Sequence, residues 1–169
     1  IFEDGFGYNG YSFEKIVFCE GYQAKDNPFF DDIDLQPAKG EVLLVRIPGA
    51  NFRKIYKDKI FLVHQYEDVY WAGSGYEWEF TSDAPTIQGR EEIEKSLQTM
   101  LKVPYEVIAH KAGVRPSTGI RRPLLRQHFE YKGMYLFNGL GTKGASLAPF
   151  FARQFARYIV VGNAEDLKY

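Results

Sequence analysis

The feature that most constrains the fold is a glycine-rich turn close to the C-terminal end of the sequence. Residues 139–144, GLGTKG, follow an expected strand over 133–137 and precede an expected helix over 146–160. Dinucleotide-binding folds place such a turn there, with an acidic residue about 20 positions later, as Asp166 is here. Only the nine residues 161–169 remain after the helix, and they are mostly polar. They leave no room for a second buried strand, so this turn does not open a complete dinucleotide-binding unit.

The turn has two interpretations. Glycines let a ligand approach the backbone closely. The first N–H groups of the following helix lack helical partners, and the helix dipole favours negative charge beside them. A flavin ring, which gains negative charge on reduction, would suit such a position. On the residues alone, a plain strand-to-helix turn is the favoured interpretation.

The remaining pattern is mostly strands. Turn signals at Asp4-Gly5 and Asn9-Gly10 predict hairpins, and helix 90–101 and helix 146–160 each have one apolar face. The expected strands are 15–19, covered on both faces, 41–47, 105–110, and the antiparallel pair 59–65 and 69–74. The expected buried helix residues are Ile93, Leu97, Met100 and Leu101, then Leu147, Phe151, Phe155, Tyr158 and Ile159. The sequence predicts an α+β fold with a largely antiparallel, mixed sheet and two main helices.

Composition excludes several classes of function. The net charge of -1 gives no general attraction to nucleic acid or to an anionic membrane, and no apolar run is long enough to span one. Three histidines without ligand spacing and one cysteine predict no metal site. Cys19, expected to be an inert core residue, cannot form an internal disulfide and fits a cytoplasmic location. Because the sequence begins with Ile1, we expect a fragment of a longer protein, and removal of a leader is the alternative explanation for the missing Met.

Two stretches carry a family resemblance. The first is AGVRPST at 112–118, followed by Pro123, and the second is GMYLFNGLGTKGASLAP at 133–149. In this order they resemble the C-terminal part of the glycine oxidase/D-amino-acid oxidase superfamily. Looser similarities at 15–21, 37–44, 61–63 and 70–73 extend the resemblance over most of 15–160.

The resemblance implies the substrate-domain half of an FAD-dependent oxidoreductase. We therefore expect residues 1–169 to form a single folded unit, with 22–132 as the substrate-binding domain. Segments 1–21 and 133–161 would return to the FAD-binding domain. Nothing in residues 1–20 matches the family's dinucleotide motif, so the expected partner is a missing N-terminal FAD-binding half. By resemblance, the FAD contacts are Gly21, Gly139, Leu140, Gly141, Thr142, Lys143 and Gly144.

Arg115 matches the family arginine that holds a substrate carboxylate beside the flavin. Its planar guanidinium suits both carboxylate oxygens and stays charged. The alternative is a structural arginine paired with an acid such as Glu20 or Glu41. Phe61 stands where glycine oxidase has a tyrosine, and Thr142 stands where it has an arginine. These two departures leave fewer carboxylate contacts, so a bulkier or secondary amine is as plausible a substrate as glycine.

Several other residues have a functional and a structural interpretation. Arg121 and Arg122 replace a frequent family aspartate, and they could bind an anionic substrate tail or be simply solvated, which we favour. His64 and His110 are expected to be structural. Tyr76, Trp78 and Phe80 alternate and could line a pocket, although ordinary strands and loops also contain such aromatics.

The implied function is oxidation of the C–N bond of an amino acid or related amine by hydride transfer to flavin. Arg115 would act by orienting the substrate. The fragment alone is expected to be inactive. The alternative is a non-catalytic structural or binding module that retains the fold, and a weaker third possibility is a flavin enzyme acting on a nucleic-acid base. The sequence does not specify the substrate, the electron acceptor or the oligomeric state.

Overall fold

The protein is described by a computed structural model that covers residues 5–162. It divides into two compact units. Unit 1 comprises Ile1–Pro37 and Arg115–Tyr169, and unit 2 comprises Ala38–Val114. The expected division into a substrate-binding domain over 22–132 and segments that return to the FAD-binding domain stays a prediction, while the compact units meet at 38 and 114. Residues before 38 belong to unit 1 because Phe30 shares a core with Met134 and Leu136.

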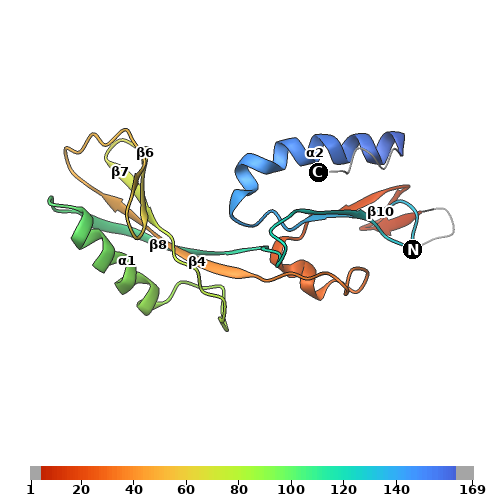
Figure 1. Ribbon diagram of the computed structural model, residues 1–169, viewed down its shortest axis with the longest axis horizontal. Coiled ribbons are helices and arrows are strands. Elements are labelled where there is room, and N and C mark those ends of the chain that lie inside the picture. The colour runs from red at the N-terminus through yellow and green to blue at the C-terminus, as the bar shows by residue number, and fades with distance from the viewer. Residues whose placement is uncertain (1–4, 163–169) are drawn as a thin grey trace. The chain divides into compact units, whose positions relative to one another are not determined.

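Unit 1 contains a three-stranded mixed sheet. Its strands are β3 (Ile16–Phe18), β10 (Met134–Asn138) and β9 (Leu124–Gln127), in the order β3-β10-β9. Strand β10 pairs parallel with β3 and antiparallel with β9. Helix α2 (Gly144–Val161) runs along one face of this sheet (Figure 1), where Phe151 and Phe155 pack on Tyr135. Because side chains alternate along β10, Met134 and Leu136 enter a second core that includes Phe6 and Phe30.

The N-terminal part of unit 1 confirms one hairpin and corrects two expectations. Strands β1 (Phe6–Tyr8) and β2 (Tyr11–Phe13) pair across Asn9-Gly10, whose φ values of 49° and 80° are those a tight hairpin turn requires. Asp4 lies outside the described residues. Strand β3 is not covered on both faces, since it is an edge strand and Val17 is 40% exposed. Cys19 lies beyond the end of β3 and is exposed, not in the core.

Unit 2 is built on a five-stranded sheet covered by one helix. The strand order is β5 (Tyr56–Lys57), β6 (Phe61–Tyr66), β7 (Val69–Gly73), β4 (Ala38–Arg46) and β8 (Glu106–Arg115). The neighbours from β5 to β4 pair antiparallel, which confirms the expected β6–β7 pair. Helix α1 (Ile87–Met100) lies against this sheet (Figure 1), with Ile93 and Leu97 buried among Leu43, Val45 and Tyr70.

The fold class is the predicted α+β, while several element boundaries differ from expectation. Helix α1 begins three residues early because the hydroxyl of Thr86 accepts a hydrogen bond from the Gly89 amide. Strand β8 continues to Arg115, and the short strand β9 was not expected. Helix α2 has the predicted buried stripe and ends at Gly162, with φ 78°. No helix within residues 5–162 is long and apolar enough to cross a membrane.

Candidate functional site

The glycine turn follows directly from β10. The residues predicted to contact a cofactor take successive places: Gly139 and Leu140 follow the strand, Gly141–Lys143 form a 3-10 turn, and Gly144 begins α2. Asn138, which is 3% exposed, holds the start of this segment. Its side-chain amide donates to the Gly21 carbonyl at 2.8 Å, and its side-chain oxygen accepts from the Gly139 amide at 2.8 Å. The structure therefore brings Gly21 and the glycine turn together.

The turn also contacts the segment that carries Arg115. The Gly141 amide donates to the Pro116 carbonyl at 3.1 Å. Gly139 has φ 72°, and a Cβ placed on it would lie 2.8 Å from the methyl carbon of Thr118. Glycine is thus required at 139 both by its backbone conformation and by close packing. The backbones of the arginine segment and the turn are neighbours within unit 1, while the role of the Arg115 side chain remains a prediction.

Helix α2 begins without a side-chain cap. Its N-cap position, Lys143, has φ -102° and makes no side-chain capping hydrogen bond, and no acidic residue lies in the first turn. Thr142 and Lys143 are both exposed. The first amides of a helix lack helical partners and carry the positive end of the helix dipole. Within the turn, the amides of Gly141 and Lys143 already donate to the carbonyls of Pro116 and Leu140. The positive end of the helix dipole at this turn suits an anionic or electron-rich ligand edge.

Phe61 is the first residue of β6 in unit 2, and its ring is 41% exposed. The Lys57 ammonium lies 5.4 Å from the ring centroid. A phenyl ring offers an apolar wall and no hydroxyl donor, so Phe61 cannot replace the tyrosine contact of the resembling family.

A second polar centre, in unit 2, was not found from the sequence. Lys39 lies in β4 and is 1% exposed. Its ammonium is 3.0 Å from Glu41 Oε1 and 3.3 Å from Glu77 Oε2. The signal that could have revealed it is Lys39-Gly40-Glu41 inside an apolar strand. Residues i and i+2 share a sheet face, and charges on a buried face need partners.

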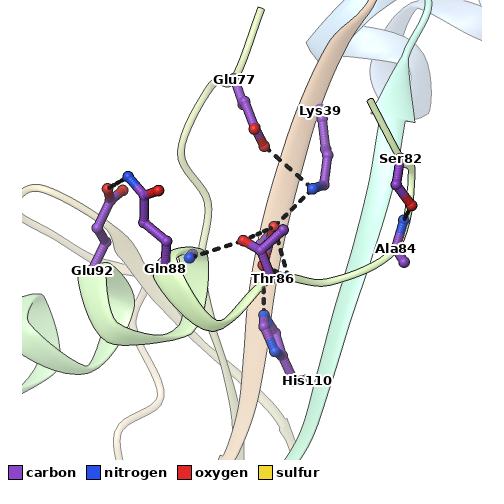
Figure 2. Close-up of polar contacts among 10 residues, drawn as sticks. Lys39, Glu77, Ser82, Ala84, Thr86, Gln88, Glu92 and His110 are labelled. Carbon is purple, nitrogen blue, oxygen red and sulfur yellow. Dashed lines mark hydrogen bonds and ion pairs between the residues drawn. The ribbon is translucent and has the colours of Figure 1, made fainter. Parts of the chain in front are cut away.

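Lys39, Thr86 and His110 point toward one another at the N-terminal end of α1 (Figure 2), and all three lie against the Glu41 carboxylate. It accepts hydrogen bonds from the Thr86 amide at 3.0 Å and the Thr86 hydroxyl at 2.8 Å. A Cβ added to Gly89 would collide with this carboxylate. His110 points toward it from β8, with Nε2 2.7 Å from Glu41 Oε2, although the ring N–H is not aligned for a hydrogen bond. His110 therefore lies beside the Glu41 carboxylate, and its expected structural role stays a prediction.

The charges of this network stabilise one another. Burial acts to raise the pKa of Glu41, but hydrogen bonds from Thr86 and Lys39 outweigh it and hold the pKa below its ordinary 4.5. Burial acts to lower the pKa of Lys39, but Glu41 and Glu77 hold it above its ordinary 10.5. Both residues are therefore charged at neutral pH.

A pocket of about 320 Å³ adjoins this network within unit 2. Its lining includes Lys39, Glu41, Tyr76, Glu77, Gln88 and Glu92. Tyr76 therefore lines a pocket, whereas its stacked neighbour Trp78, at a centroid distance of 6.1 Å, is 57% exposed and does not. Because Lys39 is already neutralised by two carboxylates, we interpret this centre as structural. In residues 5–162, no three His, Cys, Asp or Glu side chains are placed to hold a metal ion.

Comparison with known proteins places the fold. Residues 3–158 match the family described as FAD dependent oxidoreductase. Among solved structures, iminodiacetate oxidase from Chelativorans sp. BNC1 superposes with TM-score 0.76 at 20% identity, over 92% of this chain and 45% of that one. Glycine oxidase from Geobacillus kaustophilus superposes with TM-score 0.76 at 21% identity, over 89% of this chain and 42% of that one. L-proline dehydrogenase from P. horikoshii superposes with TM-score 0.72 at 18% identity, over 89% of this chain and 44% of that one. The chain thus spans less than half the length of these proteins.

Proposed function

This chain belongs to the FAD dependent oxidoreductase family, and from that premise we propose that the full-length protein oxidises the C–N bond of an amino acid or related amine. The observation that carries the proposal is the contact between the Gly139–Gly144 turn, which opens the uncapped helix α2, and the segment that bears Arg115. The names of the similar structures, which are oxidases or dehydrogenases of amines and amino acids, support the same class of substrate.

The residues at the turn fit FAD. Glycines at 139 and 141, with φ 72° and 54°, leave the backbone free of side chains, and the uncapped amides of α2 suit the electron-rich edge of a flavin ring. We assign the contacts to Gly21 and to Gly139–Gly144. FAD, when bound, supplies the hydride acceptor.

Arg115 binds the substrate carboxylate in this proposal. A two-pronged guanidinium contact fixes the carboxylate and so sets the direction of the α-carbon. This is catalysis by positioning, in which the protein orients the reacting bond and the cofactor supplies the chemistry. By resemblance, Phe61 and Thr142 stand at positions where glycine oxidase has two further carboxylate contacts, a tyrosine and an arginine, and neither replaces the contact it stands for. Both choices favour an amine larger than glycine.

The rest of the cofactor site belongs to the part of the protein that this chain does not contain. We propose that an N-terminal FAD-binding half supplies the adenosine and pyrophosphate contacts, so that residues 1–169 alone bind FAD poorly and are inactive. We also place the full-length protein in the cytoplasm, which the single Cys19 fits.

The visible spectrum of the purified full-length protein tests this function. We expect flavin absorbance that bleaches with at least one member of a panel of amino acids and secondary amines. Flavin that no amine reduces would favour the non-catalytic alternative. Full-length protein without flavin would contradict the assignment of the turn as a cofactor site.

A further inference from the structure

We propose that Asn138 is a positioning residue for the flavin, because its side chain holds two backbone segments assigned to FAD, at Gly21 and at Gly139, in one fixed arrangement. This inference rests on the proposed function, since it takes both segments as cofactor contacts. It goes further by assigning a task to a buried side chain that acts on the cofactor through its neighbours.

The Asn138 side chain links two segments that lie far apart in the sequence. Its amide nitrogen donates to the Gly21 carbonyl across 117 positions, and its oxygen accepts from the adjacent Gly139 amide. The side chain lies at the last position of β10 and is shielded from solvent. A carboxamide carries a donor and an acceptor side by side. An apolar residue of the same shape would therefore lose both hydrogen bonds at once.

The backbone pairing between the two segments ends before it reaches these glycines. Strand β10 pairs parallel with β3, and Leu136 opposite Phe18 is the last pair of their register. Asn138 lies two residues beyond that pair on one side, and Gly21 lies three residues beyond it on the other. The side chain of Asn138 thus connects the segments where their strands no longer do. Its loss would free Gly21 from the glycine turn without breaking the β3–β10 pairing.

The two linked glycines differ in their surroundings. Gly21 has φ 62° and Gly139 has φ 72°, a region of the backbone that favours glycine. A Cβ added to Gly21 would meet no described atom within 4 Å, whereas one added to Gly139 would lie 2.8 Å from the Thr118 methyl carbon. Gly21 therefore borders open space, while Gly139 is packed in place. The hydrogen bond from Asn138 fixes the open segment to the packed one.

The FAD dissociation constant of the full-length apoprotein tests this inference. Asn138→Leu keeps the shape of the side chain and removes both hydrogen bonds, and we expect it to weaken FAD about tenfold. Asn138→Ser is a milder, uncharged variant whose side chain is one bond shorter, and it should weaken FAD about threefold. The absorption maxima of the flavin that still binds should shift in both variants, because the segments around it are no longer fixed. If Asn138→Leu does not fold, Asn138→Ser decides.

His128→Phe is the matched control for lost buried hydrogen bonds in unit 1. His128 is buried at the opposite end of β10 from Asn138, where its amide donates to the Met134 carbonyl. Its Nδ1 accepts from the Glu130 and Tyr131 amides at 3.0 and 3.1 Å, and phenylalanine removes both bonds. We expect His128→Phe to lower the urea midpoint of the apoprotein, as Asn138→Leu does. FAD affinity should stay within about twofold, with unchanged absorption maxima.

FAD affinity and absorption maxima that do not change in the Asn138 variants would overturn the inference and make Asn138 a structural residue. An equal loss of FAD affinity in His128→Phe would also overturn it. These measurements need no amine, so they are separable from the test of the oxidase. Weaker FAD binding in the Asn138 variants of a protein whose flavin no amine reduces would support the inference and contradict the oxidase. Unchanged binding in variants whose flavin amines do reduce would have the reverse meaning.

Discussion

The two helices of this protein begin in opposite ways. At the start of α1, Thr86 caps the Gly89 amide, and the buried carboxylate of Glu41 lies against the same turn. At the start of α2, Lys143 caps nothing, and a glycine turn takes the place of an acidic partner. The first amides of a helix lack partners within the helix, and they carry the positive end of its dipole. Unit 2 satisfies this demand with its own side chains, whereas we propose that unit 1 leaves it to a ligand.

The largest expected effect comes from removing the anion at α1. Glu41→Gln leaves the buried Lys39 ammonium with Glu77 alone and weakens the contact to Thr86. Breaking one side of a buried ion pair costs about 3–5 kcal/mol. We expect a loss of that size in the free energy of unfolding of the full-length protein, measured in urea. A loss below about 1 kcal/mol would mean that the network contributes little to stability.

The same network predicts a pH dependence. The folded state holds the pKa of Glu41 below 4.5, so its stabilising contribution is present above that pH and is lost as the pH falls through the folded pKa. The pKa of Lys39 is raised above 10.5, so its contribution is present below that pH and is lost as the pH rises through the folded pKa. Urea unfolding across pH should show a steeper acid loss in the unmodified protein than in Glu41→Gln. An equal loss of unfolding free energy at acid pH in the two proteins would contradict this prediction.

The next largest effect concerns Arg115 beside the glycine turn. Arg115→Lys keeps the charge but would lose the two-pronged contact that we propose, at a cost of roughly 1.5–3 kcal/mol, on the order of ten- to a hundredfold in kcat/KM. Flavin content should be unchanged. Steady-state kinetics with the identified substrate measures this. Unchanged kinetics would reduce Arg115 to a structural residue, and loss of flavin would mean that it supports the cofactor site.

A smaller effect is expected at the cap of α1. Thr86→Ala removes the hydroxyl that accepts from Gly89 and donates to Glu41. Loss of an N-cap hydroxyl costs about 1 kcal/mol. Thermal unfolding of the full-length protein should show this loss, with FAD affinity unaltered. A parallel decrease in FAD affinity would contradict the separation of the two helix starts.

The smallest effect is expected at the start of α2. The hydroxyl of Ser146 donates to the Lys143 carbonyl at 3.0 Å and caps no amide. Ser146→Ala should therefore change the unfolding free energy by less than about 0.5 kcal/mol. A loss as large as that of Thr86→Ala would show that α2 has a protein cap after all.

Most of the fold could be predicted because its signals are local. The apolar stripe of α2, the face of α1 with Ile93 and Leu97, and the Asn9-Gly10 hairpin all depend on neighbours in sequence. Strand β9 was missed because its four residues, LLRQ, carry no clear alternation. The exposure of Cys19 was missed because a run of apolar residues does not distinguish a central strand from an edge strand.

The glycine-turn site and the centre around Lys39 also differ in how far the sequence predicts them. The contact between the Arg115 segment and the glycine turn could be expected because both lie in motifs of known order. The centre around Lys39 could not, because its partners Glu77, Thr86 and His110 come from three separate segments. Only the tertiary fold brings Glu77 to Lys39, and Thr86 and His110 to Glu41. Buried charges in an apolar strand are the sequence signal to look for in such cases.

The central claim is that the start of α2, and not that of α1, awaits an anionic ligand. The most direct measurement is the FAD dissociation constant of the full-length apoprotein carrying Thr142→Asp or Thr142→Asn, two variants that differ in one charge. A carboxylate beside the bound flavin edge should weaken FAD about tenfold relative to the amide. Gln88→Glu, which adds a carboxylate at the start of α1, should leave FAD affinity unchanged. Equal affinity of the two Thr142 variants, or an equal loss in Gln88→Glu, would contradict this account.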